Sequence, residues 1–186
     1  GNEIKLQNPF KISFTDGALK ITPFAFDINK GNLYGELNLM HNKETQSKIE
    51  FKNISVGKIF KKSRINIPIS GKLNGTLNIE GNLNAPRITT IINAENGKIN
   101  KIDYDRIIGN ISYSDSTLFV NNFQLEDNGN KTISVFGELP FYLNINDRIY
   151  DFYDSQSAYL NIIFNNVDLM KYHQLFLEKF TIGGKM

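Results

Sequence analysis

The longest regular pattern in the chain runs from Ile65 to Leu83. Every odd position in this run is apolar or glycine, and every even position is polar or proline. A period of two is typical of a β-strand with one apolar face and one polar face. At about 3.3 Å per residue such a run would extend over roughly 60 Å. The pattern therefore predicts one very long strand, or two collinear pieces interrupted near Pro68.

Shorter alternating runs fill most of the remaining chain and predict a nearly all-β protein. A second long run of one parity extends from Ile133 to Ile145, and a change of parity at Pro23 predicts a bulge. Further strands are expected at residues 12–14, 19–21, 24–28, 33–39, 88–94, 107–113, 118–120, 123–125 and 160–164. Turns are expected at Asp16-Gly17, Lys30-Gly31-Asn32, Asn96-Gly97 and Asn128-Gly129.

Two segments depart from this alternation. Leu169–Phe180 places apolar residues at helical spacing after Asp168, a good N-cap residue, and predicts the only helix. Residues 146–156 are acidic and aromatic, and they predict a loop.

An internal repeat is visible in the sequence. Residues 51–73 align without a gap on residues 164–186. The identical pairs are Phe51/Phe164, Asn53/Asn166, Ile69/Ile182, Gly71/Gly184 and Lys72/Lys185, and a second echo relates residues 16–26 to 115–125 and Gly35-Glu36-Leu37 to Gly137-Glu138-Leu139. The repeat predicts one unit at roughly residues 10–109 and the start of a second at roughly 110–186. We therefore expect residues 1–186 to be one fragment of a larger repetitive protein.

The composition argues against several classes of function. The chain has no cysteine, and hence no disulfide, no thiol nucleophile and no cysteine-ligated zinc. Its net charge of +2 and its single small basic cluster, at residues 58–64, do not indicate nucleic-acid binding. His41 and His173 belong to no metal-binding motif, and the spacing of Asp147, Asp151 and Asp154 does not fit a calcium loop. We expect no enzymatic activity, no metal and no cofactor.

Two stretches share a more specific order of motifs. Residues 14–39 (FTDGALKITPFAFDINKGNLYGELNL) follow the order strand, Asp-Gly, strand, Pro, strand, G-x-L-x-G-x-L-like end. Residues 69–139 contain a G-x-L-x-G-x-L-x-I-x-G-x-L-x-x-P block, from Gly71 to Pro86, followed by two strand pairs. These stretches resemble the AsmA-like and TamB family of large bacterial envelope proteins.

The resemblance implies a β-taco, which is an elongated and strongly bent sheet with an apolar interior. It implies a periplasmic protein of the cell envelope, anchored to the inner membrane by a segment outside this chain. It further implies phospholipid transport between the membranes and, for TamB, assistance to an outer-membrane assembly partner.

The one-sided hydrophobicity itself leaves two architectures open. The apolar faces either seal a β-sandwich core or form an open groove that accepts acyl chains. The length of the expected strand and the glycines on its apolar face favour the groove, as does the resemblance. We therefore expect an all-β, curved, mostly antiparallel sheet whose groove conducts phospholipid acyl chains. The expected lining residues are Leu19, Ile21, Phe24, Phe26, Leu33, Leu37, Leu73, Leu77, Ile79, Leu83, Ile133, Val135, Leu139, Phe141 and Leu143.

Two other functions fit the same pattern. A long repetitive sheet is also suited to a structural or chaperone-like scaffold that binds client strands by β-augmentation at its edge. A surface adhesin would need aromatic residues grouped on an exposed loop, and Tyr150, Phe152 and Tyr153 are the only such group in the sequence.

Overall fold

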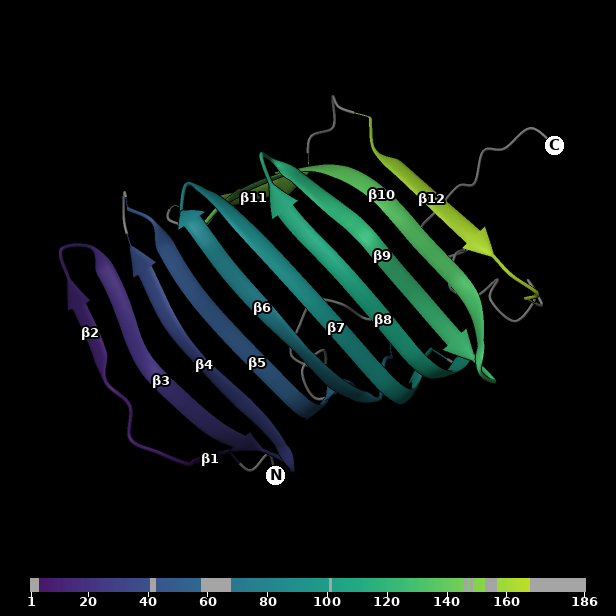
Figure 1. The fold of residues 1–186 in the computed structure, drawn as a ribbon, viewed down its shortest axis with the longest axis horizontal. Coiled ribbons are helices and arrows are strands. Elements are labelled where there is room, and N and C mark those ends of the chain that lie inside the picture. Colours follow the sequence, from purple (N-terminus) through teal and green to yellow (C-terminus); the bar gives the residue numbers. More distant parts are fainter. Residues whose placement is uncertain are drawn as a thin grey trace.

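The computed structural model describes residues 4–40, 43–57, 68–100, 102–145, 147, 149–152 and 157–167. Within these ranges the protein is built from strands that join in one sheet (Figure 1). The strands are β1 (Ile4–Leu6), β2 (Ile12–Thr15), β3 (Ala18–Ile28), β4 (Gly31–Met40), β5 (Thr45–Ser55), β6 (Lys72–Asn82), β7 (Ala85–Ile99), β8 (Ile102–Ser114), β9 (Thr117–Asp127), β10 (Asn130–Asn144), β11 (Ile149–Phe152) and β12 (Tyr159–Phe164).

The sheet is an open antiparallel meander. Its order is β1-β3-β4-β5-β6-β7-β8-β9-β10-β11, with β2 also paired to β3 and β12 also paired to β10. β1 and β2 form one edge of the sheet, and β11 and β12 lie at the other edge. The expected all-β, curved sheet is confirmed, and the described strands form a single layer, not the two packed sheets of a sandwich.

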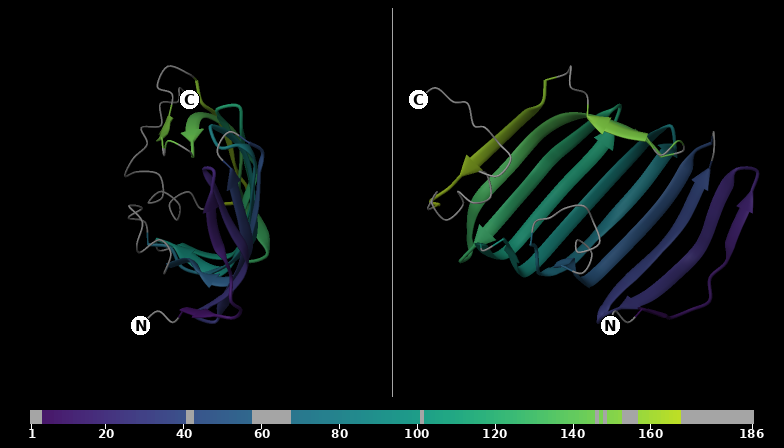
Figure 2. Two further views of the ribbon diagram at one scale, coloured as in Figure 1. Left: turned by 90° about the vertical axis from the view of Figure 1, so that its left-hand side faces the viewer. Right: turned by 180° about the vertical axis from the view of Figure 1, so that it is seen from behind.

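The sheet bends strongly along its strands, so that one face is concave (Figure 2). At its lower end the β7–β8 hairpin curls toward the concave side, and at its upper end the last part of β10 and β11 does the same. We call residues 95–100 and 102–105 of this hairpin the lower lip, and residues 140–145, 147 and 149–152 the upper lip. The hollow of the sheet therefore runs across the strands. Ten strands along the order, spaced by about 4.8 Å, give it a length of roughly 43 Å.

The run from Ile65 to Leu83 is not one continuous strand. β6 covers only Lys72–Asn82, and the described residues before it form a single bridge, between Ile69 and Ile99. The strand is interrupted at Gly71, whose φ is +127°, a value that L-residues rarely adopt. The register against β7 shifts there by one residue, because Ile69 pairs with Ile99 and Lys72 pairs with Glu95. As a result residues 68–70 bind the lower lip, whereas β6 lies in the body of the sheet. Residues 65–67 lie outside the described residues.

Several local predictions are confirmed. The register between β3 and β4 shifts between Ile21 and Phe24, which places a bulge at Pro23. Asp16-Gly17 and Asn128-Gly129 form hairpin turns with positive φ at both residues. The second long run of one parity lies in β10, which is 15 residues long.

Other local predictions are wrong. Asn96-Gly97 lies inside β7, and the hairpin turn follows at Asn100. The turn expected at residues 30–32 consists of Asn29 and Lys30, so that Gly31 already belongs to β4. Part of the loop expected at residues 146–156 is the strand β11, which pairs with the end of β10. The expected helix Leu169–Phe180, with Asp168, lies outside the described residues.

Candidate functional site

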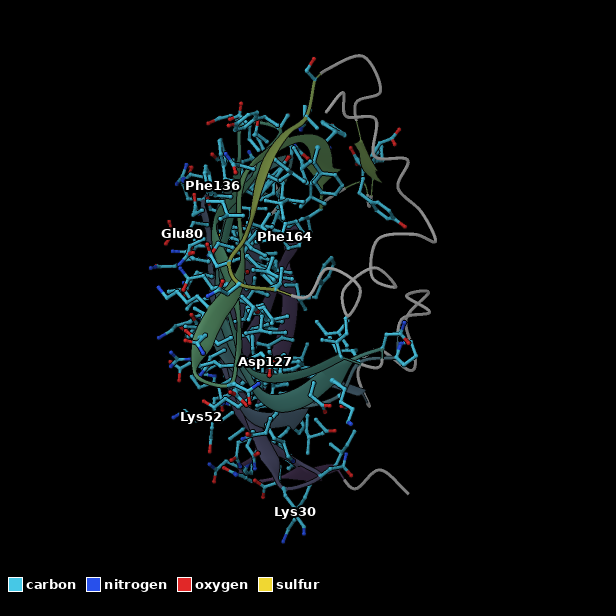
Figure 3. All side chains as sticks on the ribbon, turned by 90° about the vertical axis from the view of Figure 1, so that its right-hand side faces the viewer. Lys30, Lys52, Glu80, Asp127, Phe136 and Phe164 are labelled. Carbon is cyan, nitrogen blue, oxygen red and sulfur yellow. The ribbon has the colours of Figure 1, made fainter. Side chains whose placement is uncertain are left out.

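The concave face carries apolar side chains in rows that cross the strands. Paired residues of neighbouring strands point to the same face, so the register defines these rows. Figure 3 shows Lys52, Glu80 and Phe136 on the outer, convex side, which places their strand neighbours on the concave side. Two adjacent rows are Phe26, Leu33, Phe51, Gly75, Ile92, Gly109, Phe123, Val135 and Ile162, and Phe24, Gly35, Ile49, Leu77, Thr90, Ile111, Val120, Gly137 and Leu160.

The predicted lining residues that belong to strands all lie on this concave face. Examples are the cross-strand pairs Ile21↔Leu37 and Phe26↔Leu33 in the first half, and Val135↔Phe123 and Leu139↔Leu118 in the second. Most of these side chains are half-buried, but Phe24, Leu83 and Ile133 are at most 9% exposed. These three side chains belong to the packed core and do not form an accessible surface.

The sequence reasoning missed much of the same face. Ile49 and Phe51 of β5 lie beside Leu77 and Gly75 of β6, yet no strand was expected before Phe51. The signal was present, because Ser47, Ile49 and Phe51 alternate with charged residues. The other missed members are Ile88, Ile92, Ile111, Leu118, Val120, Phe123, Leu160 and Ile162.

Charged side chains lie on the opposite, convex face. Lys48 forms an ion pair of 2.7 Å with Glu50, and Arg106 one of 2.9 Å with Glu126. The hydrogen bond from Lys48 lowers the pKa of the Glu50 carboxyl, and Glu126 raises the pKa of the Arg106 guanidinium in the same way. None of the side chains in the two rows of the concave face is charged. The two faces of the sheet therefore differ sharply in polarity.

The lower lip closes over the largest cluster of buried side chains. This cluster contains Ala94, Ile102, Tyr104, Ile107, Leu125 and Ile133. At Asn96, with φ +49°, the inward positions of β7 change parity, although the pairing with β8 keeps its register. The Tyr104 hydroxyl donates a hydrogen bond of 2.6 Å to the Ser70 carbonyl, and the Ser70 amide donates one of 2.9 Å to the Lys98 carbonyl. These bonds hold the segment before β6 against the lip.

The buried Tyr104 makes the stability of this lip sensitive to alkaline pH. Burial raises the pKa of the Tyr104 phenol, so above about pH 10 the unfolded chain loses this proton more readily than the folded protein. The free energy of unfolding is therefore expected to fall as the pH rises through that range. Urea denaturation at a series of pH values measures the slope. Tyr104→Phe is expected to have a shallower slope, and an unchanged slope would contradict this assignment.

The upper lip covers a small apolar hollow on the concave face. Phe141 contacts Tyr113 edge to face, with ring centroids 6.0 Å apart, and the Leu143 amide donates a 3.0 Å hydrogen bond to the Tyr113 hydroxyl. The Ile145 amide reaches the Leu83 carbonyl at 2.9 Å and fixes the end of β10 over the β6–β7 turn. The hollow has a volume of about 120 Å³ and is lined by Ile88, Thr90, Ile111, Ser112, Tyr113, Leu118, Phe141 and Leu143.

Apolar side chains are most exposed at the two edges of the sheet. At the first edge Ile4, Leu6, Ile12 and Phe14 are between 43% and 74% exposed, and their pairing places them on the concave side. At the other edge Leu160 and Ile162 of β12 are 43% and 42% exposed. The apolar face thus continues to both edges.

No family model matches the chain, and neither a curated protein nor a solved structure matches it. In the part of the chain that the structure describes, no helix has the length and apolar character needed to cross a membrane. The sequence resemblance to the AsmA-like and TamB family therefore enters below as part of a proposal.

Proposed function

We propose that the concave face binds the acyl chains of phospholipids and forms one segment of a lipid path between two membranes. The observation that supports this most is the pair of uncharged rows that cross the sheet from β3 to β12 and stay partly accessible. An ordinary sheet of this size would cover such a face with helices or a second sheet.

The physical basis is the cost of moving a lipid through water. Each methylene group exposed to water costs about 0.8 kcal/mol, so a bare acyl chain faces a large barrier. A concave apolar face removes most of that cost while the polar headgroup stays in solvent. Two polar side chains on this face already have hydrogen-bond partners within the protein. The hydroxyl oxygens of Thr45 and Ser47 accept hydrogen bonds from the backbone amides of Met40 and Asn38, respectively.

The proposal also covers the cellular location of the protein. Together with the sequence resemblance, it makes the protein a periplasmic component of the bacterial envelope, held at the inner membrane through other segments. It also allows for a partner in outer-membrane protein assembly. The alternative role as a strand-binding scaffold rests on the sheet edges and not on the concave face.

Lipid binding tests the proposal directly. The purified chain is expected to carry co-purifying phospholipid in native mass spectrometry, and to bind a fluorescently labelled fatty acid. Leu77→Glu places a carboxylate on the floor of the concave face and is expected to weaken fatty-acid binding by more than about tenfold.

Asn78→Glu provides the matched control, since Asn78 is the next residue on β6 and points to the convex face. Its side chain donates a hydrogen bond of 3.2 Å to Thr89 there. Fatty-acid binding by this variant is expected to equal that of the parent chain. Lipid-free protein that binds no fatty acid, or equal losses in the two folded variants, would refute the proposal.

A further inference from the structure

Two hairpins of the sheet share the same local geometry. β3–β4 and β9–β10 are each preceded and joined by turns of two residues with positive φ. The angles are 50° and 73° at Asp16-Gly17, 48° and 58° at Asp115-Ser116, 49° and 74° at Asn29-Lys30, and 53° and 72° at Asn128-Gly129. Both hairpins also change register at corresponding places, between Ile21 and Phe24 and between Val120 and Phe123. The β9–β10 hairpin has one further shift, between Lys131 and Ile133. The two hairpins are therefore structural counterparts.

The strands that follow these hairpins also correspond. β5 pairs with β4 through Leu33↔Phe51 and Gly35↔Ile49, and β12 pairs with β10 through Ile133↔Phe164 and Val135↔Ile162. In this register the structural counterpart of Gly35 is Val135. The sequence repeat instead matches Gly35 with Gly137, two residues further along β10.

The ends of β5 and β12 correspond as well. Two residues after Phe51 comes Asn53 with φ +54°, and two residues after Phe164 comes Asn166 with φ +48°. The next side chains, Ile54 and Val167, both turn inward, Ile54 being 6% exposed and Val167 packing on the buried cluster. β12 is thus the counterpart of β5.

The two counterparts differ at their outer edges. β5 is covered by β6, with Ile49 opposite Leu77 and Phe51 opposite Gly75. Among the described residues β12 pairs only with β10. Its sequence, YLNIIF, has no charge and no proline, the devices by which proteins commonly protect an edge strand from pairing. Apolar side chains are exposed on both of its faces, with Ile162 and Ile163 each at 42%.

We propose that the outer edge of β12 is a docking site for one further antiparallel polypeptide strand with the sequence pattern of β6. The docked strand takes the register in which β5 holds β6, with a leucine opposite Ile162 and a glycine opposite Phe164. This inference does not require lipid binding, because it rests on strand pairing at the outer edge of β12.

The glycine in this pattern has a specific reason. At Gly75 an added Cβ would lie 2.2 Å from the Ile91 carbonyl oxygen of β7, and 2.7 Å and 2.9 Å from two ring atoms of Phe51 on β5, so the aromatic ring takes up part of the space of a side chain. Aromatic residues commonly cover a glycine on the neighbouring strand in this way. By analogy with Phe51 and Gly75, we expect the position opposite Phe164 to favour glycine over valine in the same register. The docking edge therefore selects a glycine followed two residues later by a leucine.

A labelled peptide copy of β6 tests the proposal. The peptide SGKLNGTLNIEGNL, residues 70–83 of this chain, is titrated with the protein and followed by fluorescence anisotropy. We expect saturable binding that is weakened at least about tenfold when the glycine and leucine corresponding to Gly75 and Leu77 are replaced by valine and asparagine. Hydrogen exchange of the β12 amides is expected to slow when the peptide is bound.

Variants of the protein identify the binding edge. Ile162→Lys, or Leu160→Lys if the first variant is misfolded by circular dichroism, is expected to weaken peptide binding at least about tenfold. Ile91→Lys is the control, because Ile91 is 55% exposed on the convex face of the interior strand β7. Peptide binding that survives both β12 substitutions would overturn the proposal. So would absent binding, or a dimer of the chain that dissociates in Ile162→Lys, because a second copy would then occupy this edge.

Discussion

Replacement of Leu125 by alanine is expected to lower the free energy of unfolding by about 2–5 kcal/mol. Leu125 is only 2% exposed and lies between its cross-strand partners Ile107 and Ile133. All three belong to the buried cluster beneath the lower lip, and the surrounding strands are too constrained to fill the space that the leucine leaves. Urea denaturation followed by circular dichroism measures the change.

Leu77→Ala makes the same chemical change on the open part of the concave face. Leu77 is half-buried, so its truncation removes fewer contacts and leaves no closed cavity. The loss of stability is expected to be less than half of that for Leu125→Ala. Equal losses would show that the apolar face is one sealed core, and would remove the basis for a lipid-accessible surface.

Gly97→Ala is expected to destabilise the protein by an amount near the upper end of about 1–3 kcal/mol. A Cβ at this position would collide with the Ser70 carbonyl oxygen and with the Tyr104 hydroxyl. Neither group can move freely, because the Tyr104 hydroxyl donates its hydrogen bond to that same carbonyl. Thermal denaturation and urea denaturation both report the change.

Gly129→Asn is the matched control for the glycine substitution. Gly129 has φ +72° in an exposed hairpin turn, and no atom lies within 4 Å of an added Cβ. Asparagine tolerates this left-handed conformation better than other residues with a side chain. Its cost is expected to stay below about 1 kcal/mol. A comparable cost at both glycines would contradict close packing as the cause of the effect at Gly97.

The alternation of apolar and polar residues predicted most of the strands and the face on which each side chain lies. Period two reports the two faces of a strand, and neighbouring strands in register then share a face. For this reason the predicted lining residues that belong to strands, from Leu19 to Leu143, all lie on one face. β5 was overlooked although its alternation was as clear as that of β4.

The failures have a common physical cause, which is that tertiary contacts decide between local options. Asn96-Gly97 is a strong hairpin signal in isolation. In the fold Gly97 is needed inside β7, where Ser70 and Tyr104 approach its backbone too closely for a side chain. In the same way the alternation from Ile65 to Leu83 persists through Gly71, although the regular pairing with β7 is interrupted there by a register shift of one residue. A pattern of faces carries no information about such interruptions or about the two lips.

Because the concave hollow runs across the strands, its width and its length depend on different features of the sheet. Strand length sets how wide and how deep the hollow is, and the number of hairpins sets how long it is. Adding one hairpin lengthens the hollow by about 10 Å and leaves its cross-section unchanged. Under the proposed lipid path, duplication or deletion of hairpins would therefore change the distance that the path spans, while the lengths of the individual strands would keep the width available to an acyl chain.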